Sequence, residues 1–393
     1  MKVIRGEREL SEKDIEDLPK GLIPGEWIFL FDASAQQKYI AYVNPRAEIF
    51  FKIKLIKSVE KNTATTDSEI VFAENTLASL INQAISAREK YIDYSSGLRL
   101  IYGINDSIPG LIVDKYKKYI LIQINTAGID RFRELIRKTI QARNPNHEVL
   151  FFDNEEYRKA EVLPSHERES ISDYLEISEN GLQYKIPRVV MQKVGYYYDH
   201  RENRNKLKNL IQRLGIKKEK GLDLFSYVGS WGLHLLSSGV ESVVFVDQGQ
   251  MQEAVMGNIA LNDFTGRGEF VRMDVFKYLD LAKTENKKFN IIVSDPPAFT
   301  KSEKNKLSAL QGYEKLHTKA LKILEDEGLM VAASCTHYVS YEELDKTMQE
   351  AALKNGQKLQ LLDMGGQGFD HPMSGLNDKS FYIKYLVYYI SRG

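Results

Sequence analysis

The sequence predicts an α/β protein whose C-terminal half forms a doubly wound parallel sheet. Three observations support this prediction. Strand-like and helix-like stretches alternate from about residue 186 onward. Aromatic-rich runs separated by polar turns occupy residues 1–67, and residues 68–185 mix helical periodicity with short strands. We therefore expect three domains: a β-rich domain at 1–67, a central α+β domain at 68–185 and the doubly wound domain at 186–393.

The N-terminal segment is expected to fold as a small barrel or sandwich. Its strands are predicted at residues 26–32, 39–43 and 49–55, with turn signals at Pro24-Gly25 and Asn44-Pro45. No catalytic site is visible here. A packing or dimerisation module is therefore an alternative to a binding domain.

The central and C-terminal segments differ in how their elements follow one another. In the central segment we expect helices at 76–94 and 126–143 and strands at 98–102, 108–114, 119–124, 149–152 and 184–186. In the C-terminal segment we expect strands at 222–225, 242–246, 269–272, 289–293 and 328–334, with helices at 231–238, 251–262 and 307–324. This regular alternation is typical of parallel sheets.

Composition excludes several classes of protein. The chain has 393 residues, 43% of them hydrophobic and 27% charged, which is ordinary for a globular protein. No run approaches the ~20 apolar residues of a membrane span, and the N-terminus does not resemble a signal peptide. The single cysteine excludes a disulfide framework and a multi-cysteine zinc site. We therefore expect a cytoplasmic protein without a membrane partner or a metal.

Charge is balanced overall but not locally. The chain has 54 basic and 54 acidic residues, whereas residues 185–220 contain 11 basic and 3 acidic residues, a net charge of +8. Such a stretch is either a surface that contacts phosphates or a solvated helix face. For the first case we expect it near the cleft.

The ends of the predicted parallel strands carry the informative residues, because ligands of such sheets bind there. The first turn, with Asp223, Gly229 and Gly232, is not a G-x-G-x-x-G pattern, so a dehydrogenase with NAD is poorly supported. Asp247 follows the second strand and can accept both hydroxyls of a ribose. Asp274 follows the third strand, within reach of an adenine amino group, although a helix N-cap is the usual role of such an acid. The pattern fits a nucleoside without phosphates, for which S-adenosylmethionine is the obvious candidate.

The fourth and fifth strands end in groups suited to chemistry on a pyrimidine. Prolines stiffen the turn after Asp295, whose carboxylate can hydrogen-bond N3 or N4 of a base. Cys335 follows the fifth strand, and a thiolate that adds to C6 makes C5 of a pyrimidine nucleophilic. Such a thiolate requires a pKa lowered by nearby positive charge. His337 is either a base or a polar neighbour, and a buried structural role is the alternative for Cys335.

Several motifs together resemble one enzyme family. Residues 191–204 (MQKVGYYYDHRENR) resemble its QKTGFFLDQRENR segment, and residues 223–229 (DLFSYVG) resemble DLFSYTG. Residues 295–299 (DPPAF) and 334–337 (SCTH) are similar to DPPSF and SCSH, and residues 108–114 (IPGLIVD) to LPGLIVD. The chain thus resembles the bacterial large-subunit (23S) rRNA cytosine-C5 methyltransferases that carry an N-terminal PUA domain.

The resemblance implies a fold, a cofactor and a partner. The fold is a Rossmann-like class I methyltransferase domain with an N-terminal PUA-like RNA-binding domain, of which residues 42–49 look like the end. S-adenosyl-L-methionine is the implied methyl donor. Large-subunit rRNA, free or in an early particle, is the implied partner, and a homodimer stays open. Val194 and Val228 replace threonines of the family, and the PUA segment is less basic than expected.

The resemblance also implies site residues. Cys335 is the implied nucleophile, with Asp295 beside it. The cofactor is expected to contact Asp223, Phe225, Tyr227, Gly229, Asp247, Asp274 and Asp295. For RNA we select Lys193, Arg201 and Arg204 from the basic stretch, with ion pairs to nearby acids as the alternative. Two other functions stay open: methylation of a purine nitrogen (guanine N7 or N2) with a structural Cys335, and a non-catalytic role in RNA binding or ribosome assembly.

Overall fold

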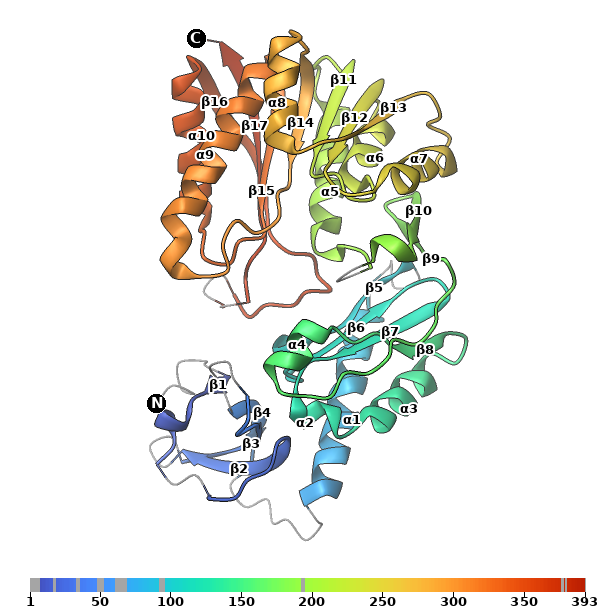
Figure 1. Ribbon diagram of the computed structural model, residues 1–393, viewed down its shortest axis with the longest axis vertical. Coiled ribbons are helices and arrows are strands. Elements are labelled where there is room, and N and C mark those ends of the chain that lie inside the picture. Colours follow the sequence, from blue (N-terminus) through green and yellow to red (C-terminus); the bar gives the residue numbers. More distant parts are fainter. Residues whose placement is uncertain are drawn as a thin grey trace. The chain divides into compact units, whose positions relative to one another are not determined.

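The computed structural model describes residues 8–16, 19–32, 36–47, 53–60, 69–91, 96–191, 195–375, 378 and 380–392. The chain divides into two compact units, whose elements Figure 1 labels. One consists of Met1–Leu175 with Asp370–Pro372, and the other of Glu176–Phe369 with Met373–Gly393. Within the described residues, no helix has the length and apolar character that crossing a membrane requires.

An antiparallel sheet begins the first unit. Its strands are β1 (Glu9–Leu10), β2 (Glu26–Asp32), β3 (Gln37–Val43) and β4 (Ile53–Val59), in the spatial order β1-β4-β3-β2. A small core of Leu10, Ala41, Val43, Ile53 and Leu55 holds them together. The strands expected at 26–32 and 39–43 are confirmed. For the strand expected at 49–55, residues 49–52 lie outside the described part of the chain.

The turn before β2 packs tightly against the helical part of the same unit. Gly25 has a φ of +78°, and a Cβ at this position would lie 2.4 Å from the carbonyl oxygen of Ala127. Only glycine avoids both the strained backbone and the clash. Beside it, Trp27 Nε1 donates a hydrogen bond to the carbonyl of Gly128 at 3.0 Å. Buried polar contacts therefore join the β-rich segment to the α+β segment.

The α+β part of the first unit is built on a four-stranded sheet of order β5-β6-β7-β8. Its elements are α1 (Glu69–Arg88), β5 (Leu98–Tyr102), β6 (Leu111–Lys115), β7 (Tyr119–Ile124), α2 (Ala127–Asp130), α3 (Arg133–Arg143), β8 (Glu148–Phe151) and α4 (Glu155–Ala160). The single helix expected at 126–143 is wrong. The chain breaks between α2 and α3, where the ring of Phe132 packs edge-on against Trp27 with centroids 5.7 Å apart.

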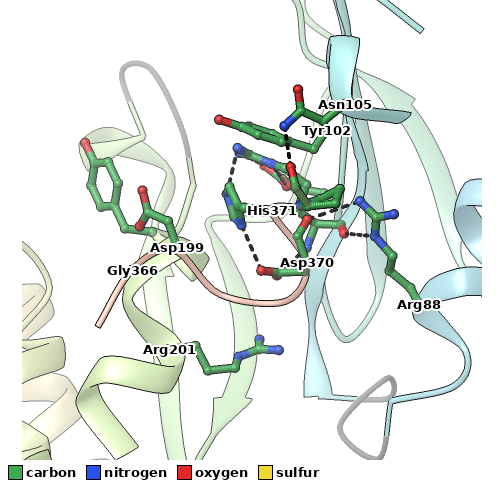
Figure 2. Close-up of polar contacts among 12 residues, drawn as sticks. Arg88, Tyr102, Asn105, Asp199, Arg201, Gly366, Asp370 and His371 are labelled. Atoms are coloured by element: carbon green, nitrogen blue, oxygen red, sulfur yellow. Dashed lines mark hydrogen bonds and ion pairs between the residues drawn. The ribbon is translucent and has the colours of Figure 1, made fainter. Parts of the chain in front are cut away.

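A tripeptide from the C-terminal part of the chain completes the first unit (Figure 2). Asp370 Oδ2 accepts the backbone N–H of Arg99 at 3.0 Å, and the Asp370 carbonyl accepts a hydrogen bond from Arg88 at 3.2 Å. His371 Nε2 lies 3.0 Å from Arg99 Nη1, and its ring lies against that of Tyr102. Asp370 and His371 are buried, so this tripeptide is a structural part of the first unit.

The second unit begins with a hairpin and a helix. β9 (Tyr174–Glu179) and β10 (Leu182–Pro187) are joined by Asn180 and Gly181, which have φ values of +52° and +84°. This Asn-Gly pair is the preferred two-residue hairpin turn because both positions tolerate positive φ. The strand expected at 184–186 is thereby confirmed. Helix α5 (Arg201–Arg213) follows.

A seven-stranded sheet forms the centre of the second unit, in the order β13-β12-β11-β14-β15-β17-β16. Its strands are β11 (Lys220–Leu224), β12 (Ser242–Asp247), β13 (Gly268–Arg272), β14 (Phe289–Ser294), β15 (Leu324–Ser334), β16 (Gln357–Gly365) and β17 (Lys384–Arg392). The helices are α6 (Ser230–Ser237), α7 (Gln252–Leu261), α8 (Val275–Thr284), α9 (Lys306–Ile323) and α10 (Tyr341–Lys354).

The expected parallel sheet is confirmed for its first five strands and incomplete beyond them. β13, β12, β11, β14 and β15 pair in parallel. β17 then runs antiparallel to both β15 and β16, and the sequence analysis placed no element after residue 334. In β16 the half-exposed Leu361 and Met364 break the alternation that identifies a strand.

Helices cover both faces of this sheet. Alternate strand residues such as Leu222, Val246 and Met330 form one large core with α8, α9 and α10. Phe245, next to Val246, faces the opposite side, where a Cβ on Gly232 of α6 would lie 2.1 Å from its ring. The strand order reverses between β11 and β14, which is where doubly wound sheets bind their ligands.

Candidate active site

The loop from β11 to α6 is strained. Phe225 and Tyr227 have φ values of +62° and +49°, which are uncommon for residues with a side chain, and Gly229 has +87°. Such conformations persist only where the surroundings enforce them, and they cluster at ligand-binding sites. Asp247 Oδ2 accepts the Tyr227 N–H at 3.0 Å, and the Tyr227 hydroxyl donates to the carbonyl of Gly195 at 2.8 Å. These hydrogen bonds therefore hold the loop in place at the switch point of the sheet.

Asp223 lies beneath this loop. It is fully buried, and its Oδ2 accepts the N–H of Gly232 at 2.8 Å. Its Oδ1 has no hydrogen-bond partner among the described residues. Burial raises the pKa of Asp223 to about 8; the Gly232 hydrogen bond opposes this shift, and the charges of Asp295 and Asp247 add to it. Asp223 therefore lies in a negatively charged environment that a cationic ligand would neutralise.

Asp247 and Asp274 end neighbouring strands but differ in their contacts. Besides Tyr227, Asp247 accepts the N–H of Gly249 at 2.7 Å and stays partly exposed. Asp274 caps α8 by accepting the N–H of Lys277 at 3.0 Å. Asp274 thus has the helix-capping role that the sequence analysis named as usual for such an acid. The capping hydrogen bond uses Oδ1 of its carboxylate.

Asp295 is oriented by two buried aromatic residues. Trp231 Nε1 donates to Asp295 Oδ2 at 2.9 Å, and His200 Nε2 lies 3.6 Å from Oδ1. Asn203 Nδ2 lies 3.0 Å from His200 Nδ1, and the rings of His200 and Trp231 pack against each other. The sequence analysis assigned no role in the site to His200 or Trp231. Their positions depend on α5 and α6 meeting at this edge, which no local pattern predicts.

Cys335 follows β15, the strand beside β14, and it is partly buried. Its thiol lies 3.7 Å from the carbonyl oxygen of Pro296, in the turn after Asp295. Burial and the negative charges of Asp295 and Asp199 raise the pKa of Cys335 to about 12. The expected lowering of the Cys335 pKa is therefore wrong, because burial and nearby negative charges outweigh the positive charge of Lys384.

A chain of hydroxyl groups ties these two strand ends together. The Tyr313 hydroxyl lies 2.8 Å from Ser334 Oγ and 2.7 Å from Thr336 Oγ1, on either side of Cys335. Thr336 Oγ1 also accepts the N–H of Phe299 at 3.2 Å. His337 is exposed, with its ring edge-on to Tyr338. The structure thus brings Asp295 and Cys335 together at one rigid edge.

The arginines selected for RNA are buried. Arg204 donates to both carboxylate oxygens of Glu179, at 2.5 and 2.9 Å, and to the carbonyl of Tyr197 at 2.8 Å. Arg201 Nε lies 3.6 Å from Glu179 Oε2, and its guanidinium lies over the ring of Tyr198. This geometry favours the alternative of a structural role over phosphate contacts. Lys193, the third selected residue, lies outside the described residues.

The basic stretch does not lie together at the cleft. Its middle part forms α5, and Lys217, Lys218 and Lys220 precede or begin β11. The site lies at the carboxyl end of β11, so these lysines lie at the opposite edge of the sheet. The expectation that the whole stretch from residue 185 to 220 lies near the cleft is therefore wrong.

Known structures share this architecture. A protein from Streptococcus mutans described as a SAM-dependent methyltransferase superposes with a TM-score of 0.76 at 20% identity, covering 99% of this chain and 96% of that chain. A methyltransferase complexed with SAH gives a TM-score of 0.77 at 20% identity, covering 99% and 97%. These two structures thus have the fold of this chain.

Sequence comparison identifies the family. Ribosomal RNA large subunit methyltransferase I from Aeromonas salmonicida is 30% identical over 298 residues, 74% of each chain. The protein of the same name from Pseudoalteromonas atlantica is 30% identical over 314 residues, 78% of each. A family model described as "Conserved hypothetical protein 95" matches residues 201–353. This chain belongs to the ribosomal RNA large subunit methyltransferase I family.

Proposed function

We propose that this chain uses S-adenosyl-L-methionine to form 5-methylcytosine in large-subunit rRNA, with Cys335 as the nucleophile. The observation that carries the proposal is that Cys335 and Asp295 follow adjacent parallel strands, with the Cys335 thiol 3.7 Å from the carbonyl oxygen of Pro296 beside Asp295. The names of the relatives support rRNA as the substrate. Mapping 5-methylcytosine in rRNA from a strain that lacks the gene tests the proposal, which requires that one site lose its modification.

The residues around the loop fit S-adenosyl-L-methionine. This cofactor carries a positive sulfonium and an ammonium group, and the charges of Asp295 and Asp247 act on the buried Asp223 here. Asp223 Oδ1 and the hydroxyl of Ser226 are buried without hydrogen-bond partners among the described residues. Buried polar atoms of this kind are normally satisfied, so a bound ligand is the natural partner. The partly exposed Asp247 would hold the ribose hydroxyls.

The chemistry of this chain's own residues follows from their order around the base. Asp295 takes the proton of the Cys335 thiol and passes it to N3 of the cytosine. Cys335 Sγ bonds to C6, and the electron pair of the C5–C6 double bond shifts so that C5 becomes nucleophilic. The bound cofactor supplies the methyl group. A base then removes the C5 proton, the bond from Cys335 to C6 breaks, and N3 returns its proton through Asp295 to the departing sulfur, so that neutral 5-methylcytosine and the Cys335 thiol are restored; the exposed His337 is a candidate for the base.

Methylation of a purine nitrogen is the second candidate function. The raised pKa of Cys335, which results from burial and the charges of Asp295 and Asp199, favours it, because a protonated thiol suits a structural cysteine. In that case Asp295 and the prolines after it would orient the base. A non-catalytic RNA-binding role is less well supported, because it assigns no purpose to the strained loop or the buried carboxylates.

RNA recognition is assigned by proposal to the first unit. We take the four-stranded sheet in residues 1–67 as a PUA-like RNA-binding domain, followed by a central domain that ends near Leu175 and by the methyltransferase domain. The boundary expected between residues 185 and 186 falls inside β10, which belongs to the second unit. We propose that this chain acts on free rRNA or on an early ribosomal particle. Because rRNA would be its substrate, we also propose a cytoplasmic location. A homodimer is compatible with this arrangement.

Replacing Asp247 tests the cofactor site. Because a hydrogen bond to a charged group contributes about 1.5–3 kcal/mol, loss of two to the ribose should weaken S-adenosyl-L-methionine binding at least ~tenfold in Asp247→Ala. Asp247→Asn keeps one acceptor oxygen, so its affinity for S-adenosyl-L-methionine should lie between those of the unaltered protein and Asp247→Ala. Glu253→Ala, at an exposed acid on α7, is the matched control. Unchanged affinity in folded Asp247→Ala, measured by calorimetry, would remove Asp247 from the site.

A further inference from the structure

Lys384 is a buried cation at the end of the strand beside the proposed nucleophile. It begins β17, directly opposite Ser334 in the antiparallel pair with β15. Lys384 is 2% exposed, and its Nζ donates to the carbonyl oxygen of Thr336 at 2.6 Å. It forms no ion pair with any acid in the described part of the chain. A buried ammonium without a counter-ion is costly, so its presence requires an explanation.

Titratable groups of both charges surround the Cys335 thiol. The titratable groups that face Cys335 are Asp295 after β14, Asp199 and Tyr197 before α5, Tyr313 on α9 and Lys384 on β17. Glu343 on α10 faces Lys384. Asp295 and Asp199 disfavour a thiolate, and Lys384 is the cation in this set. The buried ammonium of Lys384 and the partly buried thiol of Cys335 therefore lie where the ammonium could neutralise a thiolate.

We infer that the ammonium of Lys384 is the counter-charge that stabilises the thiolate of Cys335. The inference rests on the proposed function in one respect, that Cys335 acts as the nucleophile. When the thiol proton leaves to Asp295, Lys384 keeps its own protons, and thiolate and ammonium form a neutral buried pair. When Sγ bonds to C6, the negative charge moves to the base. Lys384 is thus a positioning residue that acts through Cys335.

Two observations agree with this role. Burial lowers the pKa of Lys384 to about 8, an effect that the charges of Cys335 and Glu343 oppose, so most of its ammonium is present at neutral pH. The hydrogen bond to Thr336 holds Nζ against the residue that follows Cys335. The structural alternative is that Lys384 only caps the end of β15. That alternative predicts lower stability in a variant but no change in how the thiol titrates.

The single cysteine makes the test specific, since alkylation of the chain by iodoacetamide reports Cys335 alone. In Lys384→Met we expect alkylation at pH 8 to slow about tenfold, which corresponds to a thiol pKa about one unit higher. Lys384→Arg should restore most of the rate. Because arginine stays charged at high pH, its rate should also keep rising above pH 8, where Lys384 loses its proton.

Lys306→Met is the matched control, because Lys306 Nζ lies 2.7 Å from Glu343 Oε1 and faces the same acid as Lys384. Its alkylation profile should match that of the unaltered protein. A folded Lys384→Met variant with an unchanged pH profile would overturn the inference. If that variant does not fold, a Lys384→Arg profile identical to the unaltered one above pH 8 overturns it as well. Failure of the proposed function is seen separately, as methyl transfer by Cys335→Ala.

Discussion

Cys335→Ala is expected to abolish methyl transfer to rRNA while the protein stays folded. Without the thiol no bond to C6 can form, and C5 of cytosine is not nucleophilic in its ground state. Cavity formation is a minor effect, since the side chain loses only one partly exposed sulfur. Incorporation of labelled methyl groups into rRNA measures the result, with thermal unfolding as the check on folding. Turnover at the unaltered rate would replace the cytosine assignment with purine-nitrogen chemistry.

A trapped adduct gives the same prediction a positive readout. RNA with 5-fluorocytidine at the target has no C5 proton to lose, so the protein should stay attached through Cys335. The adduct should survive denaturing electrophoresis and be absent in Cys335→Ala. Substrate RNA should also protect the thiol from iodoacetamide. A protein that methylates rRNA but never forms an adduct would separate the methyltransferase assignment, which would stand, from the covalent mechanism, which would not.

Arg204→Ala is expected to destabilise the second unit by about 3–5 kcal/mol, because it leaves the carboxylate of Glu179 buried without its main partner. Glu179 is 1% exposed; burial raises its pKa, but the charges of Arg204, His234 and Arg201 hold the pKa below its ordinary value. Denaturant unfolding measures the loss. Arg213→Ala, at an exposed arginine on the same helix, is the control and should change stability little.

The same variant decides between the two interpretations of the basic stretch. A buried Arg204 makes no phosphate contact, so the salt dependence of RNA binding should keep its slope in the folded fraction. A slope shallower by about one unit, with stability unchanged, would restore Arg204 as a phosphate ligand. Acid should weaken the pair, since Glu179 has a lowered pKa and its stabilising charge is lost only as the pH falls through that value.

Local pattern predicted where the candidate site residues lie, because the carboxyl ends of parallel strands meet at one edge of the sheet. Asp247, Asp295 and Cys335 each follow a short apolar run, and their position after a strand is enough to place them at the ligand edge of the sheet. Asp274 shows the limit of that reasoning. Asp274 follows β13 but also directly precedes α8, and its carboxylate caps that helix.

Contacts between distant segments could not be predicted in this way. Glu179 lies 25 residues before Arg204, and nothing in the charge count of residues 185–220 distinguishes an arginine that is paired and buried from one that faces solvent. The break between α2 and α3 likewise depends on Trp27, about a hundred residues earlier. The missed strand β17 brings Lys384 opposite Ser334 across 50 residues of sequence.

The order of strands and helices, the residues at the strand ends and the membership of a methyltransferase family were thus legible in the amino-acid sequence, because each depends on apolar periodicity or on a contiguous motif. The protonation of the Cys335 thiol, the partners of Arg201 and Arg204 and the burial of Lys384 were decided only by the folded chain. Burial and electrostatic interactions depend on which groups lie within a few ångströms in space, and linear sequence does not contain that information.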